Sequence, residues 1–308
     1  MAELVIAIFG PTASGKSAVA EELAWRIPAE LVSADSMQVY RGLPILTNQS
    51  PARLVGIWDL GHDASVGEYQ ELAHRAIDGI LAAGRTPVVV GGTGLYFRAA
   101  LAELDLPPAP EPGARERLER LYDRVGAEKA HELLSERDPA AAASLHPNDR
   151  RRVVRALELA EAGSSLRPES DRLWAGETRH PTLIVGLELT REVLRRRIEE
   201  RAREMFERGV EDEVRRVLAR PVSRTASHVH GLRDIADLPP EEAYEALVTR
   251  TRRYAVYQLR WMRRIPGVVS LNAERDPGDL ADEILEMARS RQRLPARGAG
   301  GAERPADA

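Results

Sequence analysis

Cysteine is missing from this chain of 308 residues, and lysine occurs only twice. The absence of cysteine excludes disulfide bonds and thiolate metal sites. There is no apolar run of about 18 residues, the length of a membrane-spanning helix, so we expect no membrane contact. The N-terminus lacks the basic segment of a signal peptide, and its apolar run ends at Gly10-Pro11. These absences predict a soluble cytoplasmic enzyme.

An excess of positive charge is also missing, because the net charge at neutral pH is −4. The total does not point to a nucleic-acid partner, but such binding depends on local patches rather than on the sum. Arginine supplies nearly all of the 44 basic residues. One arginine cluster, Arg150-Arg151-Arg152 with Arg155, is dense enough to form a patch of this kind.

The chain does contain a phosphate loop, which holds one of the two lysines. The loop follows the pattern G-x-x-x-x-G-K-[ST] and reads Gly10-Pro11-Thr12-Ala13-Ser14-Gly15-Lys16-Ser17. A buried strand over 4–9 precedes it and a helix from 16 to about 27 follows, which is the setting that this motif requires. We expect its backbone N–H groups and Lys16 to hold phosphate, and Ser17 to hold Mg²⁺.

Strands and helices alternate along most of the chain, which predicts an α/β fold: a parallel sheet with helices on both faces. Strands are expected at 4–9, 30–33, 86–90, 182–189 and 267–271. A charge-rich helical stretch without strands interrupts this alternation. We therefore expect a P-loop core over 1–112 and 181–290, an all-helical insertion over 113–180, and a disordered tail over 291–308.

Asp35 stands where a parallel sheet binds its ligands. It follows the second predicted strand directly, and open α/β sheets bind ligands beyond the carboxyl ends of their strands. A carboxylate there faces the phosphate loop and could act as a general base or a Mg²⁺ partner. Asp also fills the N-cap of many helices, and position alone does not decide between the two roles.

The strand at 86–90 ends in a second polar turn, Gly91-Gly92-Thr93-Gly94. The glycines would expose backbone N–H groups to a ligand, and Thr93 would offer a hydroxyl. The alternative is a tight strand-to-helix turn that binds nothing.

Arg151, Arg152 and Arg155 are neighbours on a helix that begins near Asp149. Guanidinium groups bind phosphates bidentately and stack on bases, so these residues could hold RNA. The alternative is a solvated helix face paired with nearby glutamates.

Two further groups are expected to have no function of their own. The run Arg195-Arg196-Arg197 is flanked by glutamates and is predicted to be a solvated helix face. His228 and His230 are predicted to be surface residues of a turn rather than metal ligands.

Taken together and in order, these segments resemble the bacterial tRNA dimethylallyltransferase (tRNA isopentenyltransferase) family. The similarity covers about residues 4–272, and its most specific parts are Asp-Ser-Met-Gln-Val-Tyr at 35–40 and Gly-Gly-Thr-Gly-Leu-Tyr at 91–96. The family transfers a dimethylallyl group from dimethylallyl diphosphate to N6 of adenine 37 in tRNA. The resemblance implies this reaction, Mg²⁺ as the cofactor, and the anticodon stem-loop of tRNA as the partner of a monomeric enzyme.

The resemblance also implies roles for single residues. The base that takes the proton from N6 would be Asp35, with Lys16 and Thr93 also catalytic. Diphosphate binding is implied for Gly10, Pro11, Thr12, Ala13, Ser14, Gly15, Lys16, Ser17 and Arg233, and metal binding for Ser17. Contacts with tRNA are implied for Asp35, Ser36, Met37, Gln38, Thr93, Arg151, Arg152 and Arg155.

The chain departs from the family pattern in four places, at 43–49, 53–60, 228–233 and 254–261. Within the third, His228 stands where members of the family have a glutamine or an arginine, whereas Arg233 keeps the charge of its position. These departures bear on affinity and substrate range rather than on the chemistry.

Three other functions fit parts of the pattern: a small-molecule P-loop kinase, the same transfer to a free adenine nucleotide, and tRNA binding without catalysis. The segment 35–40 argues against the kinase. The arginine-bearing insertion favours a polymeric acceptor over a free nucleotide. The presence of Lys16, Ser17 and Asp35 argues against a protein that only binds.

Overall fold

A five-stranded parallel sheet forms the centre of the molecule, and this confirms the predicted fold class. The structure is a computed structural model that describes residues 4–106, 111, 113–166 and 172–293. The strands are β1 (Val5–Phe9), β2 (Ala29–Ser33), β3 (Thr86–Gly91), β4 (Thr182–Glu188) and β5 (Val269–Asn272). Their spatial order is β2-β3-β1-β4-β5, so the strand that leads into the phosphate loop lies in the middle of the sheet.

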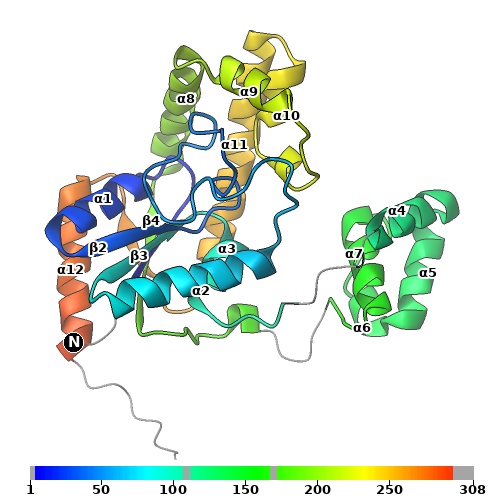
Figure 1. The fold of residues 1–308 in the computed structure, drawn as a ribbon, viewed down its shortest axis with the longest axis horizontal. Helices are drawn as coiled ribbons and strands as arrows, with labels where there is room; N and C mark the ends of the chain where they lie inside the picture. The colour runs from blue at the N-terminus through cyan, green and yellow to red at the C-terminus, as the bar shows by residue number, and fades with distance from the viewer. Residues whose placement is uncertain (1–3, 107–110, 112, 167–171, 294–308) are drawn as a thin grey trace, which may run out of the picture.

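Helices cover both faces of the sheet, because alternate residues of each strand point to opposite sides. On one face, Ile6 and Ile8 of β1 pack with α1 (Lys16–Arg26) and α12 (Pro277–Arg293). On the other face, Val5, Ala7 and Phe9 pack with four helices. Figure 1 shows the two layers around the sheet. These helices are α2 (Val66–Ala82), α3 (Gly94–Leu101), α8 (Arg191–Glu207) and α11 (Pro240–Met262).

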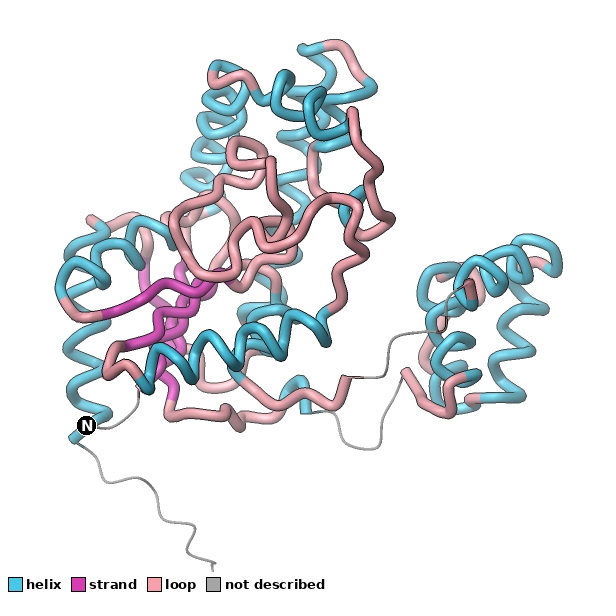
Figure 2. Tube along the Cα trace, in the orientation of Figure 1, coloured by secondary structure: helices cyan, strands magenta, loops and turns pink. Residues whose placement is uncertain are grey.

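Between α3 and β4 the described part of the chain is helical, without a strand, as the sequence predicts. Its helices are α4 (Ala114–Val125), α5 (Ala127–Arg137), α6 (Pro139–Ala142) and α7 (Arg150–Glu161). They enclose a hydrophobic cluster of their own, built on residues such as Leu118, Leu134 and Leu157. Figures 1 and 2 show this group to one side of the sheet. An ion pair from Arg224 to Glu119 of α4, at 3.6 Å, joins the group to the core.

Two shorter helices, α9 (Val210–Leu218) and α10 (Leu232–Asp237), connect α8 to α11. The predicted tail at 291–308 starts too early, because α12 continues to Arg293. Residues 294–308 lie outside the described part of the chain. The helices in that part include none that is both long and apolar enough to cross a membrane.

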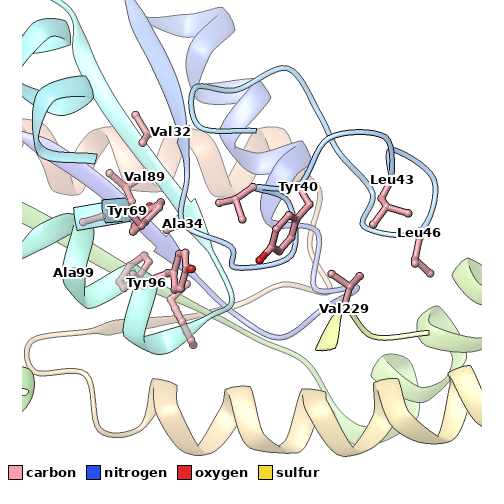
Figure 3. Close-up of a cluster of buried hydrophobic side chains, with 14 of the residues drawn as sticks. Val32, Ala34, Tyr40, Leu43, Leu46, Tyr69, Val89, Tyr96, Ala99 and Val229 are labelled. Carbon is pink, nitrogen blue, oxygen red and sulfur yellow. The ribbon is translucent and has the colours of Figure 1, made fainter. Parts of the chain in front are cut away.

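The loops that leave β1, β2 and β3 all emerge at one edge of the sheet, since the strands are parallel. An aromatic cluster lies beneath the loop that follows β2 (Figure 3). In it the rings of Tyr69 and Tyr96 lie 4.4 Å apart, and the Tyr69 hydroxyl donates a hydrogen bond of 2.9 Å to the carbonyl of Ser33. This cluster fixes the direction in which the chain leaves β2, and therefore the position of Asp35.

Candidate active site

The phosphate loop joins β1 to α1 as predicted and has the backbone strain that its glycines permit. Gly15 has φ of 89°, a left-handed conformation that side chains rarely adopt. A Cβ on Gly10 would lie 2.8 Å from the hydroxyl of Ser14 and 3.1 Å from the carbonyl oxygen of Leu187, so a side chain at this position would displace its neighbours. The N–H groups at the start of α1 have no intrahelical acceptor and face outward from the helix end. Together with the helix dipole they favour a bound anion.

Lys16 begins α1 and bends back over the loop. Its ammonium group donates a hydrogen bond of 2.7 Å to the carbonyl of Pro11. Burial lowers the pKa of Lys16 to about 8; the carboxylate of Asp35 opposes this shift, and the guanidinium of Arg201 adds to it. Burial therefore makes the charged form of Lys16 unfavourable, and an anion bound between Lys16 and Arg201 would stabilise that charge.

Arg201 is a loop contact that the sequence analysis did not assign. It lies on α8, and its guanidinium donates a hydrogen bond of 2.7 Å to the hydroxyl of Thr12. Arg197, one turn earlier, lines a cavity that the phosphate loop and Arg201 also line. The solvated-face prediction is therefore correct for the exposed Arg195 and Arg196 and wrong for Arg197. The signal lay in the spacing, since positions 197 and 201 are i and i+4 and flank the apolar stripe of α8.

Gln258 of α11 ties the phosphate loop to the turn after β3. Its carbonyl oxygen accepts the N–H of Thr12 at 2.8 Å, and its amide donates to the carbonyl of Gly92 at 2.9 Å. The hydroxyl of Ser14, in contrast, is buried and has no hydrogen-bond partner in the described part of the chain. Ser14 therefore has a donor available for a ligand, and Thr12 does not have its N–H available.

Asp35 is not a helix N-cap. One of its carboxylate oxygens accepts the N–H of Met37 at 2.9 Å within a turn, and no helix begins there. Hydrogen bonds among the described residues leave the second oxygen unengaged. Asp35 lines the same cavity as Lys16, which agrees with the prediction that it faces the phosphate loop. Neighbouring Gln38 is held in place through bonds to Ser33 and to the carbonyl of Thr47.

Thr93 joins the Asp35 loop to α11. Its hydroxyl accepts the N–H of Ser36 at 3.2 Å and lies 3.2 Å from the hydroxyl of Tyr254. Tyr254 lines the cavity, whereas Thr93 stands one layer behind it. The sequence analysis did not assign Tyr254, because nothing near it along the chain marks it.

The glycines beside Thr93 allow close packing of the turn. A Cβ on Gly91 would lie 2.2 Å from the carbonyl oxygen of Ala34, and one on Gly92 would lie 2.2 Å from the amide of Gln258. A Cβ on Gly94 would lie 2.1 Å from the ring of Trp261. Close packing thus accounts for the three glycines, and Gly91 in addition lines the cavity, whereas Thr93 does not.

These groups surround one cavity of about 490 Å³. Its lining includes residues 12–17 of the phosphate loop, Arg197 and Arg201, together with Asp35, Met37 and Gln38. Tyr254, Gln258 and His230 also line it. The carboxylate of Asp35 acts on the charges of both Lys16 and Arg201, so the carboxylate and an anion bound at the phosphate loop would share one space.

Of the remaining predicted residues, Arg233 is not among those that line this cavity. Its side chain is exposed on α10, whereas Arg201 lines the cavity. His228 is exposed, as predicted, but His230 is not a surface residue. It packs edge-on against Tyr254 with ring centroids 4.4 Å apart and lines the cavity.

The arginines of α7 divide between the two alternatives. Arg155 pairs with Glu158, whose carboxylate is buried. Its neighbours Arg151 and Arg152 are exposed and have no ion pair in the described part of the chain. The hydrogen bond from the N–H of Arg152 to Asp149 caps the helix and fixes this cluster. Two of the three predicted arginines therefore remain available for phosphates.

Several oxygen donors line the cavity, but they do not form a metal cluster. The described residues contain no group of three or more His, Cys, Asp or Glu side chains that could hold a metal. Ser17 offers a hydroxyl at the start of α1, and Asp35, Glu200 and Glu204 offer carboxylates to the same cavity. Separate donors of this kind suit an ion that takes most of its ligands from substrate and water.

Comparison with known proteins gives one consistent family. The IPP transferase family model matches residues 38–265. A tRNA dimethylallyltransferase of Salinispora tropica is 38% identical over 285 residues, which cover 87% of this chain and 88% of the relative. The crystal structure of a full-length tRNA isopentenylpyrophosphate transferase from Bacillus halodurans is 32% identical. It covers 94% of this chain and 100% of that one, with a TM-score of 0.66.

A eukaryotic dimethylallyltransferase, solved while acting on tRNA, has the same fold. Its TM-score is 0.77, at 24% identity over 97% of this chain and 82% of that one. At this identity the likeness supports the fold alone.

Proposed function

This chain belongs to the IPP transferase family, and we propose that it transfers a dimethylallyl group from dimethylallyl diphosphate to N6 of adenine 37 in tRNA. One observation carries the proposal: the phosphate loop with Lys16 and the carboxylate of Asp35 face a single cavity. An alkyl transfer needs groups that stabilise the leaving group and a group that removes a proton. The cavity offers the phosphate loop with Lys16 for the first task and Asp35 for the second.

The phosphate loop and the side chains around it would hold the diphosphate. Lys16 and Arg201 bring positive charge, the start of α1 brings N–H groups, and Ser14 brings an unengaged hydroxyl. An exocyclic amine is a weak nucleophile, so the reaction needs the diphosphate to be a good leaving group. Groups that bind the charge developing on the diphosphate oxygens lower this barrier.

Mg²⁺ fits the oxygen donors beside the phosphate loop. It prefers oxygen, keeps several waters and binds through one or two protein groups plus substrate phosphates. Ser17 would supply the protein hydroxyl, with Asp35 within reach of the same cavity. When bound, the ion would neutralise charge on the diphosphate.

Asp35 would remove the proton from N6. As N6 forms its bond to the first carbon of the dimethylallyl group, the bond from that carbon to the diphosphate oxygen breaks. The proton leaves N6 for the carboxylate oxygen of Asp35 that has no partner. Thr93 and Tyr254 would orient the adenine, which must leave its stack to enter the cavity.

The helical segment 113–180 would hold the anticodon stem-loop, chiefly through phosphate contacts of Arg151 and Arg152. Ser36, Met37 and Gln38 would contact the nucleotide that enters the cavity. We further propose that the enzyme acts as a monomer in the cytoplasm, where its tRNA substrate is found.

The test is incubation with Mg²⁺, dimethylallyl diphosphate and unmodified tRNA, followed by mass spectrometry of the nucleosides. We expect one C5H8 unit on the adenosine at position 37. Parallel reactions with adenosine monophosphate, and with ATP in place of the prenyl donor, test the two enzymatic alternatives. Modification of the free nucleotide but not of tRNA, or phosphate transfer from ATP, would overturn the proposal.

A further inference from the structure

The C-terminal half of α11 carries three neighbouring aromatic residues, of which the first lines the cavity and the second is exposed. They are Tyr254, Tyr257 and Trp261, which fall on one side of the helix. Tyr254 lines the cavity, and Tyr257 follows with its ring centroid 6.3 Å away and the two planes only 24° apart. The ring centroid of Trp261 lies 6.3 Å from that of Tyr257. The ring of Tyr254 at the cavity is therefore followed directly by the exposed ring of Tyr257.

Tyr257 is exposed in a way that packing does not explain. It is 51% exposed, one of the four most exposed large hydrophobic residues of the described chain. Below it the helix is anchored firmly. Trp261 packs on Gly94 and lies 4.8 Å from Trp174, and the guanidinium of Arg264 stacks on Trp174 at 3.6 Å. The ring of Tyr257 thus stands on a rigid support and faces solvent.

Arginines flank Tyr257 on the same face. Arg253 precedes it by four residues and Arg260 follows it by three, so the three side chains form one stripe. Both arginines are exposed, and neither has an ion pair in the described part of the chain. Elsewhere on α11, Arg250 and Arg252 are neutralised by Asp234 and Glu199. Unpaired arginines around an exposed aromatic ring match the surface on which single-stranded nucleic acids stack.

We propose that Tyr257 stacks on the base of the nucleotide next to the target adenine, and that Arg253 and Arg260 hold the phosphates beside it. The inference rests on the proposed function, because it takes the target adenine to lie against Tyr254. A base that enters the cavity past Tyr254 brings its neighbour along the strand to the next ring outward, which is Tyr257. Bases of RNA loops are recognised through such aromatic stacking.

The test measures binding rather than turnover. Fluorescence anisotropy would give the affinity of the full-length protein for an anticodon stem-loop RNA. Tyr257→Ala should weaken binding roughly 10- to 100-fold, the effect of losing one base–aromatic stack. Tyr257→Phe should retain the affinity, because the ring and not the hydroxyl makes the contact. Val256→Ala is the matched control: it removes a side chain of similar exposure from the same helix and should leave the affinity unchanged.

Two RNAs with an abasic site, one on each side of the target adenine, identify the stacked base. One of them should bind the wild type as weakly as Tyr257→Ala binds the intact RNA, and Tyr257→Ala should lose nothing further on it. Equal affinities of wild type and Tyr257→Ala would overturn the inference, as would additive losses with both abasic RNAs. Because no prenyl donor is present, failure of the proposed transfer reaction would show separately, in the nucleoside assay.

Discussion

At the scale of single residues, the carboxylate of Asp35 is the most direct test of the proposed chemistry. Asp35→Asn keeps the acceptor for the N–H of Met37, so the loop should keep its shape, while the base is lost. We expect turnover to fall roughly 10²-fold or more, with tRNA affinity nearly unchanged. Single-turnover assays and binding measurements on the same variant separate the two. A parallel loss of affinity would make Asp35 structural.

Lys16 should make diphosphate binding depend on pH. Burial lowers its pKa to about 8, so in the free protein the amine loses its charge as the pH rises through this value. The contribution of Lys16 to the affinity for inorganic pyrophosphate should therefore be full well below pH 8 and be lost as the pH rises above it. Calorimetric titrations across this range would show the effect. Lys16→Met corrects for the titration of pyrophosphate itself; identical pH profiles of the two proteins would contradict the expectation.

The residues that could be predicted are those whose role is set by their neighbours in the chain. The phosphate loop, Asp35 and Thr93 each follow a strand end, and parallel strands bring their carboxyl ends together. Arg201, Tyr254 and Gln258 come from helices far along the chain. Their role depends on how α8 and α11 dock against the loop, and one sequence does not contain that geometry. Arg233 shows the same limit: the family resemblance implied a diphosphate contact, whereas the side chain is exposed on α10 and is not among those that line the cavity.

At the scale of elements, a buried arginine holds residues 173–175, which belong to the segment that leads from the helices α4–α7 back to β4. Arg98 of α3 is 0% exposed and donates hydrogen bonds to the carbonyls of Leu173 at 2.9 Å and Ala175 at 2.7 Å. Arg98→Met would leave these carbonyls without their donor. We expect the free energy of unfolding to fall by at least about 2 kcal/mol, measured by urea denaturation.

Arg179 provides the control for this prediction. It lies in the same returning segment but pairs with Asp78 near the surface. Arg179→Ala should cost no more than about 1 kcal/mol, as surface ion pairs do. Equal losses for the two variants would mean that Arg98 contributes only as another charge.

The elements themselves follow closely from the sequence pattern, because the central strands β1, β3 and β4 are short, mainly apolar runs bounded by turn residues. β1 is buried at every position, as its unbroken apolar sequence indicates. The turn after β3 shows what pattern cannot give. Its glycines predict close approach of some group, yet only the folded chain identifies Ala34, Gln258 and Trp261 as the groups that approach.

At the scale of the whole molecule, the proposed function divides between a core that would hold the small substrate and a helical segment that would hold RNA. The sequence predicts this division, since strand patterns stop before residue 113 and resume at 182. It does not predict the contact between the parts. The ion pair of Arg224 with Glu119 joins residues over a hundred positions apart, and neither belongs to a motif.

Salt dependence of tRNA binding should report which arginines of the helical segment meet phosphate. Each phosphate contact releases counterions, so removing one lowers the slope of log affinity against log salt by about 1. We expect this for Arg151→Ala and for Arg152→Ala, because neither side chain is engaged by an acid in the described structure. Arg150→Ala is the matched control: Arg150 lies beside them on α7 but is held by Asp123 at 2.7 Å and stacks on Tyr122. Its loss should leave the slope nearly unchanged. If all three variants shift the slope alike, the ion pairs within the helical segment open when RNA binds, and the distinction between paired and unpaired arginines has no bearing on recognition.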